Sequence, residues 1–530
     1  MHSTLVPASR VHDREGLRVL LAHSLAVSRP RLVLLVSIAA VAVLAFWRLD
    51  QFPLTWFDEG SHLHVPKALV RYGVYADYSS EGFRYFGPTT GVGPTVMLPV
   101  AGSFALFGVG LWQARLVIAV YLMGCTVAMF GLARSLGGSR LAWVATALLV
   151  ASRGAPFIEY GRQVLGEVPA LFFLICGLGV WFASLSRPTA VRIALAGTLF
   201  GLAMITKQQF LIVLAPTFGF AWVANQLYYR STPQRAFILP AAIAIGLYAG
   251  WQAILILVLS PTPVAENLAL LRGTAGGAAM AFSPPLIERS IRELLDAKIF
   301  LGALTPGLIY IAFLARSRTT GSLRWAILLT LVLVNLAWYV LGSVSWLRYA
   351  FPALAVSALI VGKLFQDWTL DFRLRMDAGR GQPGESQAGT SRALRWAALG
   401  WLGMMIVVPL AQTVRQIVEP PFNAPAAMAE YLNAQLPETA TIETWEPEMG
   451  FLTDHAYHYP PEELLATAVA YIWRGSPSPS LSYDFVQRQS PEFVLVGGFA
   501  RWVDLYPSAV LEDKYRRVTT IGGYELYELR

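Results

Sequence analysis

The sequence predicts an α-helical polytopic membrane protein with about 11 transmembrane helices and a small C-terminal α/β extracytoplasmic domain. Of its 530 residues, 55% are hydrophobic and only 14% are charged, whereas soluble domains carry about 25% charged residues. Many apolar runs approach the roughly 20 residues that a helix needs to cross a bilayer. The region after residue 414 differs, because there strand signals follow a helical one.

The predicted spans follow one another along most of the chain. They cover residues 31–49, 112–133, 141–154, 168–185, 192–206, 208–228, 235–260, 299–315, 323–343, 346–365 and 395–414. The run 93–109 is also apolar, but we place it at the outer interface. Every loop on the side of the N-terminus then carries at least two arginines, as the positive-inside rule requires. The net charge of +8 is therefore assigned to cytoplasmic loops, and no nucleic-acid partner is expected.

This topology divides the chain into three parts, with the N-terminus cytoplasmic and the C-terminus extracytoplasmic. Residues 1–30 form a cytoplasmic segment, and residues 31–414 form the transmembrane catalytic domain. This domain includes a first outer loop at 50–111 with juxtamembrane helices, and a flexible Gly- and Ser-rich cytoplasmic loop at 366–394. Residues 415–530 form the extracytoplasmic α/β domain.

The C-terminal domain shows both helical and strand patterns. A helix is expected over 427–436, and strands are expected over 441–445, 492–498 and 524–529. His455 and His458 have a spacing that allows metal binding, but we interpret them as a pair in a surface loop.

Two adjacent acids, Asp58 and Glu59, follow the first span in the stretch WFDEGSHLHVPKALVRYG. Ionisable groups at membrane depth are costly and are functional candidates by default. A carboxylate here could accept a proton from an attacking hydroxyl or hold Mg²⁺ or Mn²⁺. If a helix starts near Asp58, His62 lies on the same face of that helix as Asp58, because the two residues are four positions apart. The alternative is an ordinary helix N-terminus, where acids favour the dipole.

Four further charged residues stand at predicted outer ends of spans or in the first loop. Glu167 precedes the fourth span. It is either an ordinary residue near a helix N-terminus or a second acid that faces the first loop. Lys207 interrupts two apolar runs, where it either snorkels or meets a phosphate. Arg348 opens the tenth span against the positive-inside bias, and its planar fork suits phosphate. Arg84 is a further cation of the first loop.

The chain resembles the polytopic C-type glycosyltransferases (GT-C), in particular the group of protein O-mannosyltransferases and lipid A aminoarabinose transferases. The similar stretches follow in order over roughly the first 365 residues. They are WFDEGSHLHVPKALVRYG, GFRYFGPTTGVGPTVMLPVAGSFALFGVGLWQARL, YGRQVLGEVPALFF, LAMITKQQFLIVLAP and RYAFPAL.

The resemblance implies transfer of a sugar from a polyprenyl phosphate to an acceptor hydroxyl or amine of a glycan, lipid or protein. The reaction would take place on the outer face of the cytoplasmic (inner) membrane. Asp58 and Glu59 would supply the catalytic base and its partner, and Glu167 the second acid. Lys207, Arg348 and Tyr349 would lie near the donor phosphate.

Two features of the family stay open in this chain. In the aminoarabinose transferases a lysine follows the RYF stretch, whereas here the sequence reads RYFGPTTGVGP, so either Arg84 substitutes or the donor is bound differently. Some relatives use a divalent cation and others do not. Mg²⁺, Mn²⁺ or Zn²⁺ would have Asp58, Glu167 and His62 as candidate ligands.

Two other function classes compete with the transferase. A transporter or flippase for a lipid-linked sugar would share the cationic site, but it should show repeat symmetry, and no internal repeat is visible. A non-catalytic membrane scaffold would use its C-terminal region to bind a partner. The expected partners of the transferase are the bilayer, the lipid-linked sugar and the acceptor.

Overall fold

The computed structural model describes residues 32–85, 91–154, 156–273, 280–370, 385–461, 464, 467 and 483–530. Within these residues, seven helices are long and apolar enough to cross a membrane. They are Leu111–Ala151, Glu167–Ser186, Gln209–Tyr229, Arg235–Leu259, Thr320–Gly342, Leu347–Thr369 and Ala393–Val418. The shorter apolar helices are Leu32–Phe46, Pro94–Phe107, Ala190–Thr206 and Leu304–Leu314. The predicted fold class, an α-helical polytopic membrane protein, is confirmed.

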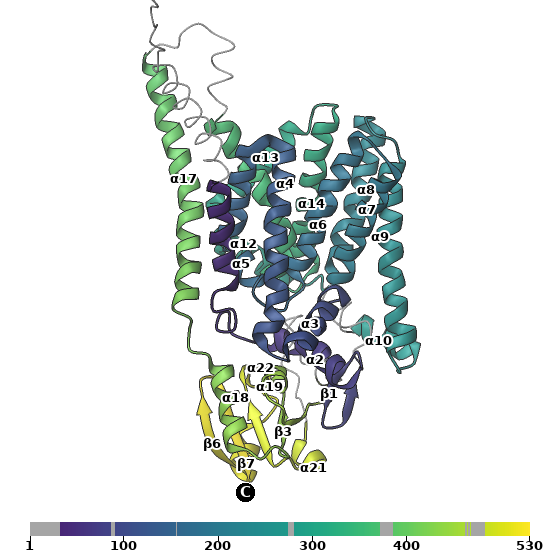
Figure 1. Cartoon of the computed structure of the whole chain (residues 1–530), viewed down its shortest axis with the longest axis vertical. Helices are drawn as coiled ribbons and strands as arrows, with labels where there is room; N and C mark the ends of the chain where they lie inside the picture. The colour runs from purple at the N-terminus through teal and green to yellow at the C-terminus, as the bar shows by residue number, and fades with distance from the viewer. Residues whose placement is uncertain are drawn as a thin grey trace, which may run out of the picture.

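The helices of the bundle carry the labels of Figure 1. They are α4 (Leu111–Ala151), α5 (Phe157–Tyr160), α6 (Glu167–Ser186), α7 (Ala190–Thr206), α8 (Gln209–Ala224), α9 (Arg235–Ile254), α10 (Val264–Gly273), α12 (Pro284–Asp296), α13 (Leu304–Leu314), α14 (Thr320–Gly342), α15 (Phe351–Phe365) and α17 (Glu385–Val418). Short 3₁₀ turns, Ile299–Gly302 and Leu347–Ala350, precede α13 and α15. Helix α15 lies at the centre, and residues 350–362 are all buried.

Two predicted spans, 112–133 and 141–154, belong to the single element α4. Its helical geometry is interrupted at Gly137 and Gly138, and Gly138 has φ of +79°. This left-handed conformation favours glycine. The chain therefore bends between the two expected spans. Both parts pack into the core, since α4 contacts α6 and α15.

The first long loop, residues 50–111, forms a platform at one end of the bundle. It contains α2 (Phe57–Tyr72), the hairpin of β1 (Asp77–Ser79) and β2 (Gly82–Arg84), and α3 (Pro94–Phe107). Figure 1 shows α2 and α3 between the bundle and the C-terminal sheet. The helix expected near Asp58 is thus present. The apolar run 93–109 forms α3, which packs against α2, α4 and α7.

The C-terminal region is a five-stranded sheet with the order β4-β3-β5-β7-β6. The strands are β3 (Thr441–Thr444), β4 (Ala456–His458), β5 (Phe493–Val496), β6 (Tyr515–Ile521) and β7 (Tyr524–Leu529). The helices are α18 (Ala424–Gln435), α19 (Pro447–Leu452), α21 (Phe485–Gln489), α22 (Gly498–Trp502) and α23 (Ser508–Lys514). Strand β3 is parallel to β4 and β5, whereas β5–β7 and β7–β6 are antiparallel. This confirms the predicted α/β region.

Strand β5 separates two small hydrophobic cores. Phe493 and Leu495 face the core that contains α18, whereas Val494 and Val496 face the core around Tyr506. Because successive side chains of a strand point to opposite faces, a strand covered on both sides is apolar throughout. This explains why the run EFVLVGG was visible in the sequence.

Two details of the sequence analysis need correction. His455 and His458 are not a surface pair, because their exposed fractions are only 9% and 5%. The predicted flexible loop 366–394 is helical at both ends, where Gln366–Leu370 forms a π-helical turn and α17 begins at Glu385. Residues 371–384 lie outside the described residues.

The C-terminal region docks on α2 through short helix α19. The Lys67 ammonium donates to the carbonyl oxygens of Gly450 (2.9 Å) and Thr453 (2.8 Å), around the end of α19. A Cβ atom at Gly60 would collide with the backbone of Glu448. The glycine therefore allows α2 and α19 to approach closely.

His458 ties the β1–β2 hairpin to the sheet. Its Nδ1 contacts the Glu443 carboxylate, and its Nε2 lies 3.2 Å from Oε1 of Glu81 in the hairpin. Because both partners are acceptors, the imidazole holds both contacts only when both ring nitrogens carry a proton. Burial lowers the pKa of His458, but the hydrogen bond and charge of Glu443, with the charge of Glu81, outweigh it and raise the pKa.

We expect the attachment of the hairpin to the sheet to weaken as the pH rises. A raised histidine pKa stabilises the folded state fully below the ordinary value of 6.5, and this contribution is lost as the pH rises through the folded pKa. Hydrogen exchange of residues 77–84, corrected for the intrinsic rate, should accelerate as the pH rises above the ordinary histidine value of 6.5.

The control for this pH dependence is the neighbouring histidine. His458→Gln should flatten the profile, whereas His455→Gln should keep it, because the His455 ring contacts Leu432 within the C-terminal region. Equal profiles for wild type and His458→Gln would contradict the assignment.

Candidate functional site

Asp58 lies in the first turn of α2 and forms an ion pair with Arg348. Arg348 reaches it from the 3₁₀ turn that precedes α15. Burial raises the pKa of Asp58, but the charge of Arg348, together with that of Lys207, outweighs it and holds the pKa below its usual value. Asp58 is therefore an ionised carboxylate at neutral pH.

A second ion pair joins Glu167 and Lys207, with 3.0 Å between Oε1 and Nζ. Glu167 is the first residue of α6 and is fully buried. Lys207 separates α7 from α8, as the interruption of the apolar pattern predicted. The charges of Lys207 and Arg348 both act on Glu167. The two ion pairs therefore form one cluster from four segments of the chain.

The guanidinium of Arg348 is enclosed by aromatic rings. Its Cζ lies 5.4 Å from the ring centre of Trp56, 4.8 Å from that of Trp346 and 5.7 Å from that of Tyr349. These rings hold the guanidinium by cation–π attraction. Its Nε has no hydrogen-bond partner among the described residues. A buried N–H group of a fixed cation is thus available to an anion.

Glu59, the neighbour of Asp58, binds a different partner. Its carboxylate pairs with Arg115 of α4, with 2.8 Å between Oε1 and Nε, and accepts the backbone N–H of Val164 at 2.9 Å. Arg115 also donates to the carbonyl of Leu49 at 2.9 Å. Both members of the pair are fully buried. Glu59 therefore fixes the start of α2 to the bundle and does not join the cluster of Asp58.

Arg115, Trp56 and Trp346 were not predicted from the sequence, whereas Tyr349, the third ring at Arg348, was. Arg115 stands in the apolar run LWQARLVIAV, where a buried arginine needs a carboxylate partner. The energetic cost of burying an unpaired arginine predicts that Arg115 has a carboxylate partner, although it does not identify that partner. Trp56 and Trp346 gave no signal, since tryptophans are common at membrane interfaces.

His62 lies one turn after Asp58 on α2, with 2.9 Å between its Nδ1 and the carbonyl oxygen of Val164. Burial, followed by the charge of Lys207, lowers its pKa to about 4. The ring is neutral at pH 7, with the proton on Nδ1 because a carbonyl can only accept. His62 thus adds no charge to the cluster.

The candidate metal ligands do not fit a metal centre. Asp58 and Glu167 each have a cationic partner, and the Nδ1 of His62 donates to a carbonyl. In the ranges that the structure describes, no group of three or more His, Cys, Asp or Glu side chains is placed to hold a metal ion.

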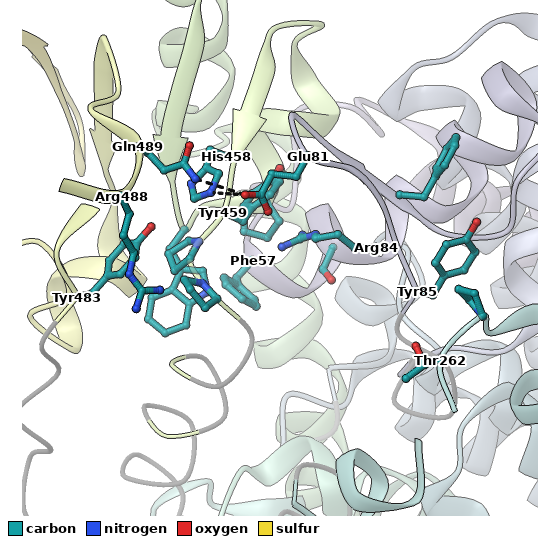
Figure 2. Close-up of a pocket in the computed structure, with 17 residues that line it drawn as sticks. Phe57, Glu81, Arg84, Tyr85, Thr262, His458, Tyr459, Tyr483, Arg488 and Gln489 are labelled. Atoms are coloured by element: carbon teal, nitrogen blue, oxygen red, sulfur yellow. Dashed lines mark hydrogen bonds and ion pairs between the residues drawn. The ribbon is translucent and has the colours of Figure 1, made fainter. Parts of the chain in front are cut away.

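The two remaining candidates lie in different places. Tyr349 is beside Arg348 and next to the cluster. Arg84 is in the hairpin, where it pairs with Asp77 and its Cζ lies 4.1 Å from the ring centre of Tyr459. Arg84 lines a cavity of about 600 Å³ between α2, the hairpin and the C-terminal region (Figure 2).

Comparisons with known proteins agree with this architecture. A family model described as dolichyl-phosphate-mannose-protein mannosyltransferase matches residues 35–267. Among curated proteins, no sequence match was found.

Two solved structures share the fold over most of the chain. The first is ArnT from Cupriavidus metallidurans bound to undecaprenyl phosphate, with a TM-score of 0.63 and 14% identity over 93% of this chain and 97% of that one. The second is the archaeal oligosaccharyltransferase AglB from Archaeoglobus fulgidus with an inhibitory peptide and a dolichol-phosphate. It has a TM-score of 0.55 and 14% identity over 94% of this chain and 74% of that one. The chain has the GT-C fold, which confirms the resemblance.

We expect loss of Glu59 to destabilise the whole protein. Glu59→Ala should lower the free energy of unfolding by about 3–5 kcal/mol, because it leaves Arg115 buried and unpaired. Thermal unfolding in detergent, followed by tryptophan fluorescence, measures the loss.

Two variants serve as controls for the Glu59 experiment. Glu59→Leu combined with Arg115→Leu should be more stable than Glu59→Leu alone, since no unpaired charge remains. Glu288→Ala breaks an exposed pair with Arg292 and should cost less than about 1 kcal/mol. If Glu59→Ala were as stable as Glu288→Ala, the anchoring role would be wrong.

Proposed function

We propose that the chain is a membrane glycosyltransferase that transfers a hexose or pentose from a polyprenyl phosphate to an acceptor hydroxyl or amine. The observation that carries the proposal is the cluster of Asp58, Glu167, Lys207 and Arg348 on the platform side of the bundle. The matched family model names a dolichyl-phosphate-mannose enzyme, and the ArnT structure holds undecaprenyl phosphate. Both support a lipid-phosphate donor.

The reaction needs a base, an electrophilic sugar carbon and a stabilised leaving group. Asp58 accepts the proton of the acceptor hydroxyl while the oxygen of that hydroxyl attacks the anomeric carbon. The bond from that carbon to the phosphate oxygen breaks, and the polyprenyl phosphate leaves with the electron pair. Lys207 and Arg348 stabilise the charge on the phosphate.

Arg348 is suited to join the base to the leaving group. One of its terminal nitrogens pairs with Asp58, while its Nε has no partner in the described part of the chain. A planar guanidinium can hold two oxyanions at different edges. It would therefore orient Asp58 and contact the donor phosphate at the same time. Attack opposite the phosphate would invert the sugar carbon.

The site would face the outside of the cytoplasmic membrane. The predicted inner loops, on the opposite side of the bundle, are rich in arginine. By the positive-inside rule, such loops lie in the cytoplasm. The N-terminus would be cytoplasmic, and the C-terminal sheet would lie outside, where the acceptor enters.

Asp58→Asn should abolish transfer but retain donor binding. In a deletion strain of the source organism that expresses the variant, the sugar-modified product should fall by about 100-fold or more, because the base is lost. Mass spectrometry of glycans, lipids and proteins measures the product. Asp50→Asn, at an exposed carboxylate of the first loop, should retain it. Full product formation by Asp58→Asn would instead favour the transporter.

Lys207→Ala and Arg348→Ala should each weaken binding of undecaprenyl phosphate to the purified protein by about tenfold or more, because each removes a charge-assisted contact. Microscale thermophoresis in detergent measures the Kd. Arg292→Ala removes an exposed cation from α12 and should leave the Kd unchanged. Unaltered binding in the double variant Lys207→Ala/Arg348→Ala would contradict the proposed phosphate site.

A further inference from the structure

The cavity beside Asp58 has no role in the proposed donor site. It has a volume of about 600 Å³, within the range of small-molecule sites. Figure 2 shows Tyr483 and Arg488 at one end and Tyr85 and Thr262 at the other. The cavity is therefore elongated, from the C-terminal region to the loop after α9.

Aromatic rings and charged groups both line its walls. The rings are those of Phe57, Phe83, Tyr85, Trp445, Tyr459 and Tyr483. Glu81, Arg84, His458 and Arg488 add charges and planar hydrogen-bonding groups. The C–H faces of a sugar ring pack on aromatic rings, while its hydroxyls bond to planar polar groups. This lining suits a saccharide, whereas an acyl chain would remove the charged groups from water without offering them a hydrogen bond.

An extended peptide would find no free strand edge here. The edge strand of the sheet at this cavity is β4, and its Tyr457 carbonyl already accepts the backbone N–H of Ser80 from the hairpin at 2.7 Å. Addition of a peptide strand needs unpaired backbone groups at such an edge. The hairpin occupies that position.

The cavity reaches the first turns of α2, which carry Asp58. Phe57 and Ser61, which line it, stand one residue before and three residues after Asp58. Residues three apart on a helix are neighbours on its surface. A ligand in the cavity therefore lies against the part of α2 that carries Asp58.

We propose that this cavity binds the acceptor and that the acceptor is a saccharide, an inference that rests on the proposed function. The hydroxyl oxygen of the bound saccharide forms the new bond to the anomeric carbon of the donor sugar. Its proton passes to Asp58, and the bond to the phosphate breaks with release of polyprenyl phosphate.

The test compares two cavity variants with wild type in a deletion strain of the source organism. Tyr85→Ala removes an aromatic wall, and Arg488→Ala removes an exposed charge at the far end. Each should lower the product by about tenfold, while the purified variants bind undecaprenyl phosphate as wild type does. Arg516→Ala, an exposed arginine of β6 paired with Glu528, is the matched control and should retain full product formation.

The position of the added sugar decides the acceptor class. Linkage analysis should find it on a saccharide hydroxyl, in a lipid extract for a glycolipid or in the polymer fraction for a polysaccharide. Attachment to an amino-acid side chain would overturn the inference and leave the transferase intact, as would full product formation by both cavity variants. If wild type and deletion strain had the same products, the proposed function itself would be wrong.

Discussion

The buried ion pair of Glu59 and Arg115 is the constraint on which the site depends. It fixes the first turn of α2 against α4, and the Leu49 carbonyl bound by Arg115 fixes the end of the preceding segment. A carboxylate and a guanidinium that are both removed from water keep their positions, because loss of either partner leaves an uncompensated charge. Asp58 is the adjacent residue, so its approach to Arg348 follows from this anchor.

Helix α2 carries two functions on different residues of the same four turns. Asp58 pairs with Arg348 in the charged cluster, whereas Lys67 and His64 bind the C-terminal region through α19. Because one helix carries both sets, the C-terminal sheet has a fixed position relative to Asp58. A catalytic group gains most from such rigid support, since small displacements of reacting atoms cost much of the rate.

The sequence predicted the helices and strands that have a regular apolar pattern, and the charged residues whose burial would be costly. Strands β5 and β7 were visible by composition, but β4 has three residues and β6 is an exposed edge strand with a charged sequence, so neither has a clear apolar pattern. Asp58, Lys207 and Arg348 could be predicted as site candidates, because a charged side chain at membrane depth is costly and is seldom there without a partner or a function. The sequence did not predict that Asp58 and Glu59 have different partners. Adjacent helix residues point in different directions, and Arg115, the partner of Glu59, is distant in sequence.

The paired charges of the cluster also explain how such a site persists without its substrate. Two isolated cations at this depth would be costly to desolvate, but Asp58 and Glu167 each neutralise one of them. The same pairing leaves the Nε of Arg348 without a partner among the described residues. A phosphate can therefore bind by adding a contact to Arg348 without first displacing Asp58. The cluster combines a tolerable cost of burial with an N–H group that has no partner among the described residues, and this combination distinguishes it from the saturated pair of Glu59 and Arg115.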